Sequence, residues 1–139
     1  MEKTIQLVAE AKRLPGFRRE LRELLQNAGV SEKVAGEILV AVQEALTNIV
    51  RHSYKGRSGK IDIVFKDLPD RIEMSIRDFG EKFDPSKIPA PELPPRKPGG
   101  LGLYLINTLM DKAEYVNQNS EGNLLYLMKY KREKEKGTR

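Results

Sequence analysis

The sequence predicts an α+β fold, in which a two-layer α/β sandwich places helices on one face of a mixed, mostly antiparallel sheet. Helical periodicity and strand-like alternation occupy separate segments, in the order β-α-α-β-β-loop-α-β-β. Two pairs of strands are separated only by short turns, as in hairpins. The 139 residues fit one domain, which we expect over residues 1–131, with a charged, disordered tail over residues 132–139.

The first half of the chain is expected to form one strand and two helices. Residues 4–9 alternate enough in polarity to form the strand. Pro15 suits the first turn of a helix whose apolar residues recur at helical spacing, and Gly29 is a typical C-terminal stop. Ser31 is a good N-cap for a second, longer helix that runs to about Ser53.

The second half contains four further strands and a third helix. The expected strands cover residues 61–65, 72–76, 113–117 and 123–131, and the helix covers residues 101–111. A turn at residues 68–70 joins the first two of these strands as a hairpin. Six of the eight prolines fall between Pro85 and Pro98, which excludes a helix or central strand there and indicates a lid or binding loop.

Composition excludes several classes of function. Without cysteine, neither a disulfide framework nor a thiolate metal site can form, and a reducing cytoplasm is the expected compartment. No apolar run approaches the roughly 20 residues that cross a bilayer, and the N-terminus lacks a signal-peptide pattern. Much of the net charge of +5 lies near the two ends of the chain, and aromatic residues are few, which favours a solvated surface over a nucleic-acid site.

The second helix carries a line of polar residues at the margin of its apolar face. That face consists of Val34, Ile38, Ala41, Val42, Ala45, Leu46 and Ile49. Glu44 and Asn48 lie one turn apart at its margin, and His52 continues the line into the apolar arc. An amide oxygen suits Mg²⁺, and a carboxylate can take a proton from an attacking hydroxyl. Hydrogen bonds to loop backbone and a structural histidine are the alternative explanation.

Asp78 is a second candidate. It has the parity of Ile72, Met74 and Ile76, so its carboxylate is expected on the buried side at the end of a strand. A buried carboxylate needs donors, and the amino group of adenine is one candidate, while capping of the following turn is the alternative. Gly80 allows a sharp turn and a close approach of the backbone to a ligand.

A glycine-rich segment opens the third helix. It consists of Gly99, Gly100, Leu101, Gly102 and Leu103. Exposed N–H groups at such a helix start form an anion site. Positive charge near phosphates could come from Lys82, Lys87, Arg96 and Lys97. The segment lacks the GxxxxGKS/T pattern of a P-loop, and no strand leads into it as in a dinucleotide fingerprint, so simple turn glycines are the alternative.

The order and spacing of these segments resemble the GHKL ATPase superfamily. The segments are residues 44–52 (EALTNIVRH), 77–85 (RDFGEKFDP), 99–103 (GGLGL) and 122–123 (GN). Within the superfamily, the small size and the two leading helices resemble the anti-sigma factor/serine-protein kinase family. The resemblance extends from about Thr4 to Tyr130 and is most specific in the first motif and the GGLGL helix start. It implies the histidine-kinase-like ATPase fold and an ATP-binding, kinase-like domain.

The resemblance also implies a role for each site residue. Asn48 would coordinate the Mg²⁺ that bridges the ATP phosphates, and Glu44 would be the general base that deprotonates the attacking hydroxyl. Asp78 would bind the adenine amino group, with Gly80 letting the base approach. The amides of residues 99–103 would hold the phosphates.

The same resemblance implies partners and a moving part. A flexible lid over residues 84–98 would cover the phosphates. In kinases of this family the acceptor is a serine of an anti-anti-sigma (STAS-domain) protein, and the same molecule sequesters a sigma factor. A homodimer is a further possible assembly.

Two positions depart from the family pattern. Lys82 stands where many members have the second glycine of DxGxG, and residues 122–124 read GNL instead of a glycine followed by threonines. The second departure removes hydroxyls expected to help hold Asp78, and it favours the alternative of a binding module that transfers little or no phosphate.

Two rival functions belong to other classes. A histidine-kinase catalytic domain would need a phosphoacceptor histidine on a helical hairpin, but His52 is the only histidine. A basic nucleic-acid regulator would bind DNA in a salt-dependent way and would not bind ATP.

Overall fold

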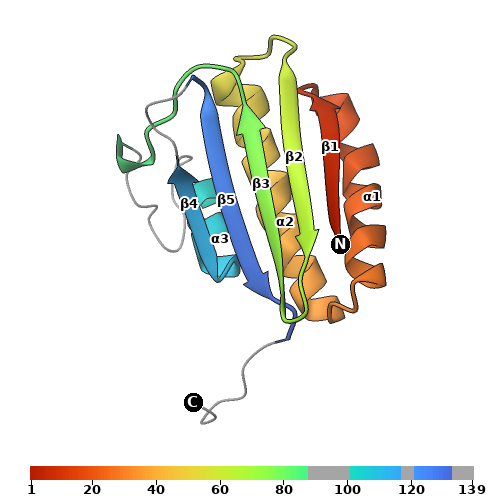
Figure 1. Cartoon of the computed structure of the whole chain (residues 1–139). Coiled ribbons are helices and arrows are strands. Elements are labelled where there is room, and N and C mark those ends of the chain that lie inside the picture. The colour runs from red at the N-terminus through yellow and green to blue at the C-terminus, as the bar shows by residue number, and fades with distance from the viewer. Residues whose placement is uncertain (88–100, 117–120, 133–139) are drawn as a thin grey trace.

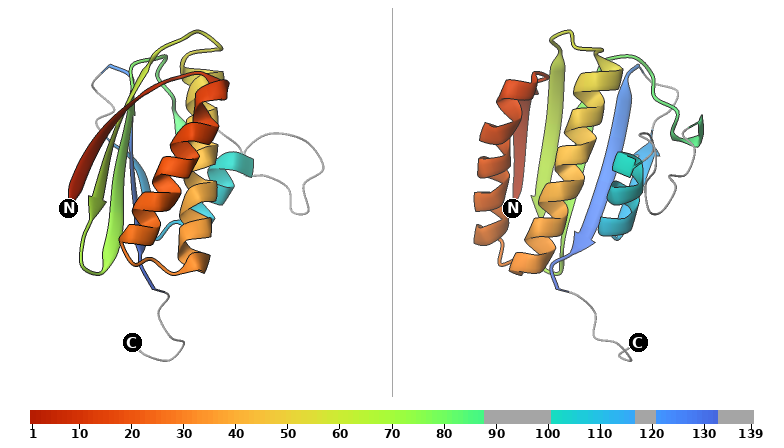
Figure 2. Two further views of the ribbon diagram at one scale, coloured as in Figure 1. Left: turned by 90° about the vertical axis from the view of Figure 1, so that its right-hand side faces the viewer. Right: turned by 180° about the vertical axis from the view of Figure 1, so that it is seen from behind.

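The computed structural model describes residues 1–87, 101–116 and 121–132. This part forms a five-stranded sheet with one layer of helices on one of its faces (Figure 1 and Figure 2). The strands are β1 (Glu2–Val8), β2 (Lys60–Asp67), β3 (Arg71–Asp78), β4 (Lys112–Val116) and β5 (Asn123–Tyr130). The helices are α1 (Leu14–Asn27), α2 (Glu32–Asn48) and α3 (Leu101–Leu109), with short turns η1 (Ala11–Arg13), η2 (Ile49–Ser53) and η3 (Pro85–Lys87). The predicted two-layer α+β fold is confirmed.

The sheet has the strand order β1-β2-β3-β5-β4, and every neighbouring pair of described strands is antiparallel. The sheet therefore lacks the parallel pair that a mixed sheet would contain, because β5 runs opposite to both of its neighbours. The last strand in the sequence thus lies between β3 and β4 (Figure 1). Its register places Asn123 opposite Asp78.

Local sequence signals set the ends of α1 and α2. Pro15 lies in the first turn of α1, and Gly29 follows the helix in the left-handed conformation, with a φ of 74°. The hydroxyl of Ser31 accepts a hydrogen bond from the amide of Val34 at 3.3 Å and so caps α2 as predicted. The two helices run antiparallel across the same face of the sheet (Figure 2).

The core lies between the helices and the sheet. The apolar face predicted for α2 is buried throughout, and the central strands contribute alternate residues. The buried strand side chains are Ile61, Ile63, Phe65, Ile72, Met74, Ile76, Leu125 and Leu127. Asp78 has the same parity and is only 2% exposed, as predicted. A carboxylate therefore lies at the edge of an apolar core, where it needs donors.

The end of the long helix differs from the prediction. α2 ends about one turn early, and residues Ile49–Ser53 continue as a π-helical turn in which the Tyr54 amide donates to the Ile49 carbonyl at 3.1 Å. The wider i→i+5 turn rotates the following side chains away from their α-helical positions. Ser53 is therefore buried while His52 is exposed, so the prediction that His52 enters the apolar arc is wrong.

The other predicted elements lie within two residues of the observed ones. The amide of Leu68 donates to the carbonyl of Arg71 at 3.0 Å and closes the predicted β2–β3 hairpin. Of the predicted lid, residues 84–87 are described, and Pro85–Lys87 form a 3₁₀ turn. Residues 88–98 and the tail from residue 133 lie outside the described residues. In the described part of the chain, no helix combines the length and apolar character needed to cross a membrane.

Candidate functional site

Two segments far apart in the sequence meet at the start of α3. Gly102, in the first turn of α3, faces the side chains of Glu44 and Asn48 on α2. A Cβ atom at Gly102 would lie 3.4 Å from Glu44 Oε1 and 3.8 Å from Asn48 Oδ1. Both side chains are half-buried. The helix start predicted to hold phosphate therefore adjoins the two side chains predicted to hold metal and to act as base.

Glu44 and Asn48 are free to contact a ligand. Within the described residues, no hydrogen bond or ion pair engages either side chain, whereas the adjacent Gln43 and Thr47 bond to each other, with 3.4 Å between Nε2 and Oγ1. The alternative explanation, hydrogen bonds to loop backbone, is therefore not met in this part of the chain. Asn48 also lines a pocket, and polar side chains left without protein partners at a pocket are typical of binding sites.

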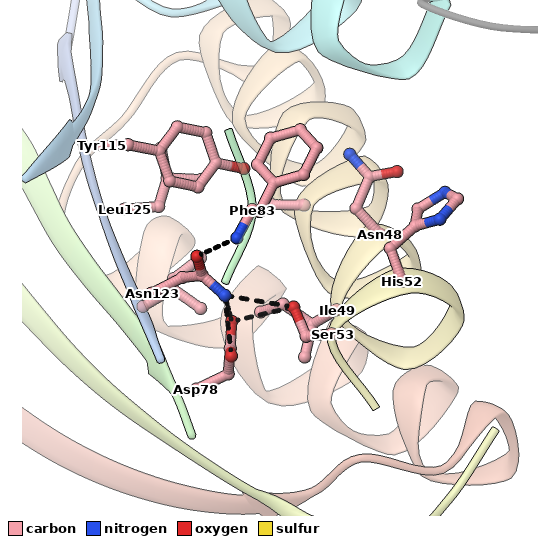
Figure 3. A pocket seen from close by; sticks show the side chains of 11 residues that line it. Asn48, Ile49, His52, Ser53, Asp78, Phe83, Tyr115, Asn123 and Leu125 are labelled. Atoms are coloured by element: carbon pink, nitrogen blue, oxygen red, sulfur yellow. Dashed lines mark hydrogen bonds between the residues drawn. The ribbon is translucent and has the colours of Figure 1, made fainter. Parts of the chain in front are cut away.

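A narrow pocket lies between the end of α2, the ends of β3 and β5, and β4 (Figure 3). Its cavity volume is about 10 Å³, room for about one water molecule, so a ligand base would have to widen the pocket. Its lining residues are Ala45, Asn48, Ile49, His52, Ser53, Ile76, Asp78, Phe83, Tyr115, Asn123 and Leu125. An apolar wall with a few convergent polar groups suits a flat heterocycle such as a nucleotide base.

Three hydrogen-bond donors hold the carboxylate of Asp78, and Figure 3 shows two of them, Ser53 and Asn123. Ser53 Oγ donates to Oδ2 at 3.2 Å, and the Gly80 amide donates to Oδ1 at 3.0 Å. Asn123 Nδ2 lies 3.1 Å from Oδ1 and 3.3 Å from Oδ2. These bonds satisfy a carboxylate that is almost fully buried. A donor from a ligand would reach Oδ2 by replacing its longer contact, the one with Asn123 Nδ2 at 3.3 Å, while Asn123 keeps its bond to Oδ1.

Asn123 corrects the expectation that the GNL sequence leaves Asp78 without support. Its amide supplies the donor that the missing hydroxyls would have supplied, and it also accepts from the Phe83 amide, with 2.7 Å between Phe83 N and Asn123 Oδ1. Neither Asn123 nor Ser53 was predicted to form part of the site. The signal for Asn123 is its register opposite Asp78, which requires the strand order. Ser53 is placed by the π-helical turn, which no pattern in the sequence indicates.

Two glycines allow the backbone to pack closely around the carboxylate. A Cβ atom at Gly80 would lie 2.3 Å from the carbonyl oxygen of Ser53, and one at Gly122 would lie 2.1 Å from the carbonyl oxygen of Asp78. Gly122 also has a φ of 68°, which side chains rarely adopt. Gly80 was predicted to admit a ligand, and the structure shows that it admits the backbone of the π-helical turn.

Two aromatic rings form another wall of the pocket. The ring centroids of Phe83 and Tyr115 are 5.1 Å apart, with an angle of 56° between the planes. Burial raises the pKa of Tyr115 to about 12, and the nearby charge of Asp78 adds to this effect. The phenol is therefore neutral near neutral pH. The pocket offers an aromatic surface beside a single buried carboxylate.

The remaining predicted residues are placed only in part. Leu101 is exposed and Leu103 is half-buried in the first turn of α3. Lys82 and Lys87 are exposed on the loop after β3, and His52 lines the pocket from the π-helical turn. The predicted residues outside the described part are Gly99, Gly100, Arg96 and Lys97.

The oxygen atoms present suit a magnesium ion that arrives with phosphates. No group of three or more His, Cys, Asp or Glu side chains that could hold a metal occurs among the residues that the structure describes. Mg²⁺ is usually bound through one or two protein oxygens together with substrate phosphates and water. Asn48 Oδ1 is a hard ligand with no partner among the described residues, and it faces a helix start that favours anions. The site therefore fits a magnesium–nucleotide complex better than a free metal ion.

This antiparallel sheet with helices on one face, and a pocket between the long helix and a strand-end aspartate, is the architecture of histidine kinase-like ATPases. The model of the histidine kinase-like ATPase domain family matches residues 7–129. The crystal structure of the RsbU and RsbW domains of a Mycobacterium tuberculosis protein has the same fold, with a TM-score of 0.67 at 19% identity over 93% of this chain. This chain spans 31% of that longer one.

Two relatives with known names show which group of histidine kinase-like ATPases this chain resembles. The serine-protein kinase RsbW of Oceanobacillus iheyensis is 39% identical over 127 residues, which cover 85% of this chain and 79% of that protein. The serine-protein kinase RsbW of Bacillus cereus strain AH187 is 34% identical over 137 residues, which cover 91% of this chain and 82% of that protein. The chain belongs to the histidine kinase-like ATPase domain family and, within it, to the RsbW serine-protein kinases. Membership of an ATPase family implies that it binds ATP.

Proposed function

We propose that this chain is an ATP-dependent kinase that phosphorylates a serine of an anti-anti-sigma protein with a STAS domain, and that it also sequesters a sigma factor. The serine-protein kinase names of its relatives support the reaction class. ATP with Mg²⁺ is the proposed donor, the cytoplasm is the proposed compartment, and residues 1–131 are the proposed kinase domain.

The juxtaposition of Gly102 with Glu44 and Asn48 carries the proposal. Glu44 and Asn48 lie on α2 and Gly102 lies on α3, and β2 and β3 lie between these helices in the sequence. Even so, a Cβ atom at Gly102 would touch both side chains. A carboxylate, an amide oxygen and a helix start are the three kinds of group that phosphoryl transfer requires beside the γ-phosphate. Their meeting supports a catalytic site rather than a set of unrelated surface features.

In the proposed complex the adenine base lies in the pocket, and its amino group donates a hydrogen bond to the carboxylate of Asp78. The phosphates extend toward α3, whose first amides have no partners within the helix. When bound, Mg²⁺ would be held by Asn48 and would neutralise phosphate charge. Glu44 accepts the proton of the acceptor serine as its Oγ forms a bond to the γ-phosphorus and the bond to the bridging oxygen breaks, so that ADP leaves.

The test is a phosphorylation assay with γ-labelled ATP, Mg²⁺ and each STAS-domain protein encoded in the same genome. We expect labelled phosphoserine on one of them. Glu44→Gln should retain ATP affinity and lower the transfer rate by about 10²- to 10⁴-fold, the usual contribution of a general base. Glu23→Gln, which alters an exposed carboxylate on α1, is the matched control and should leave the rate unchanged.

Two outcomes would contradict the proposal in different ways. Tight binding of a STAS-domain protein without phosphoserine would favour the alternative of a binding module that transfers little or no phosphate. Equal transfer by Glu44→Gln and the parent protein would exclude Glu44 as the base while leaving the kinase activity in place.

A further inference from the structure

The two positions that depart from the family pattern meet in one turn. Lys82 replaces the second glycine of DxGxG, and both of its neighbours bond to Asn123. Asn123 Nδ2 donates to the carbonyl of Glu81 at 2.9 Å, and the amide of Phe83 donates to Asn123 Oδ1 at 2.7 Å. Among the described residues other than glycine, only Lys55 has a positive φ, so the turn at Lys82 does not need a glycine.

The side chain of Asn123 joins this turn to the carboxylate of Asp78. It is 4% exposed, and its Nδ2 group lies 3.1 Å from Asp78 Oδ1 and 2.9 Å from the carbonyl oxygen of Glu81. An amide has two N–H donors and one oxygen acceptor, so it can make all of these bonds at once. A threonine hydroxyl has one donor proton and could not serve both Asp78 and Glu81.

We propose that Asn123 is a positioning residue that fixes Asp78 and the turn Gly80–Phe83 together, and thereby sets the preference of the pocket for a purine with a 6-amino group. The inference rests on the proposed function, because Asp78 is the proposed acceptor for that amino group. The carboxylate needs this support because it must face the ligand from an apolar wall.

The experiment compares the affinities of MgATP and magnesium purine-riboside triphosphate, which lacks the 6-amino group, by titration calorimetry on the full chain. We expect the parent to prefer ATP by about tenfold or more, the usual effect of a hydrogen bond to a charged group. Asn123→Ala should reduce this preference to about twofold or less while it retains affinity for the analogue. Asn27→Ala, at the exposed end of α1, is the matched control and should keep the full preference.

A more conservative variant separates positioning from general packing. Asn123→Thr should lose part of the preference, because its one donor proton cannot serve both Asp78 and the Glu81 carbonyl. If Asn123→Ala does not fold, the same comparison is made with Asn123→Thr. An equal loss of affinity for both nucleotides in the Asn123 variants would overturn the inference and assign the residue a structural role only.

The variant Asp78→Asn distinguishes failure of the inference on Asn123 from failure of the proposed function. If Asp78→Asn removes the preference for ATP and the Asn123 variants retain it, the inference on Asn123 is overturned and the role of Asp78 stands. If the parent shows no preference for ATP over the analogue, both the inference and the proposed role of Asp78 are overturned.

Discussion

Replacing Gly122 with alanine tests how closely β5 must pack against the end of β3. Gly122 immediately precedes β5, and it combines a positive φ of 68° with a position where a Cβ atom would lie 2.1 Å from the carbonyl oxygen of Asp78. Gly56 offers a matched control, because it has a φ of 81° but no atom within 4 Å of the corresponding Cβ position. Both variants strain the backbone, and only one adds a clash.

The expected loss of stability has two parts. A side chain in the left-handed region lowers the free energy of unfolding by about 1–2 kcal/mol, which applies to both variants. At Gly122 the Cβ atom meets backbone, so β3 and β5 must move apart by about 1 Å to restore ordinary contact. That movement weakens the bond between Asn123 and Asp78, and a hydrogen bond to a charged group contributes roughly 1.5–3 kcal/mol. We therefore expect a loss of about 2.5–5 kcal/mol for Gly122→Ala and about 1–2 kcal/mol for Gly56→Ala.

Urea unfolding followed by circular dichroism measures both free energies. With a urea m-value of roughly 2 kcal/mol per molar, the Gly122 variant should shift the midpoint by more than about 1 M, and the Gly56 variant by less. MgATP affinity should fall only in the Gly122 variant, because the displaced strands carry Asp78 and Asn123. A Gly122 variant that unfolds within about 0.5 kcal/mol of the Gly56 variant would refute the view that this contact is rigid.

Two further predictions concern the pocket. Asn48→Ala should leave the fold intact, because no described residue loses a hydrogen bond. It should weaken MgATP binding, measured by calorimetry, by at least about tenfold. An unchanged affinity would exclude Asn48 from the metal site. Tyr115 has a pKa raised from 10.0 to about 12 in the folded chain, so its stabilising contribution is complete below pH 10 and is lost as the pH rises toward 12. Between about pH 9 and about pH 11.5, the free energy of unfolding of the parent should fall by about 2 kcal/mol relative to that of Tyr115→Phe. Urea unfolding at both pH values measures this difference, and a difference that does not change with pH would contradict the assignment.

Most of the fold could be predicted because the local signals agree with one another. The cap at Ser31, the stop at Gly29 and the alternation in β2 and β3 depend on chemistry within a few residues, and each element lies close to its predicted place. The parity of Asp78 was enough to predict its burial. Periodicity along α2 likewise placed Glu44 and Asn48 at the margin of the core.

The parts of the site that were not predicted depend on contacts between distant segments. Asn123 acts through its register opposite Asp78, and that register follows from the insertion of β5 between β3 and β4. Ser53 is buried and His52 is exposed because the turn after α2 widens into a π-helix. Helical periodicity alone does not indicate this widening. The GNL sequence predicts a weakened site because it lacks the hydroxyls of the family pattern. The structure shows that an amide at the same position bonds to more groups than a hydroxyl can.

The place of β5 in the sheet also bears on when the protein can bind its ligand during synthesis. β3 and β4 are made before β5, but they do not touch in the finished sheet because β5 separates them. A nascent chain that ends before residue 123 therefore has Asp78 on an open strand edge, without the amide that holds it. If Asp78 binds the nucleotide as proposed, nucleotide binding would stabilise only chains whose last strand has been inserted, and ATP would be bound only once the sheet is complete.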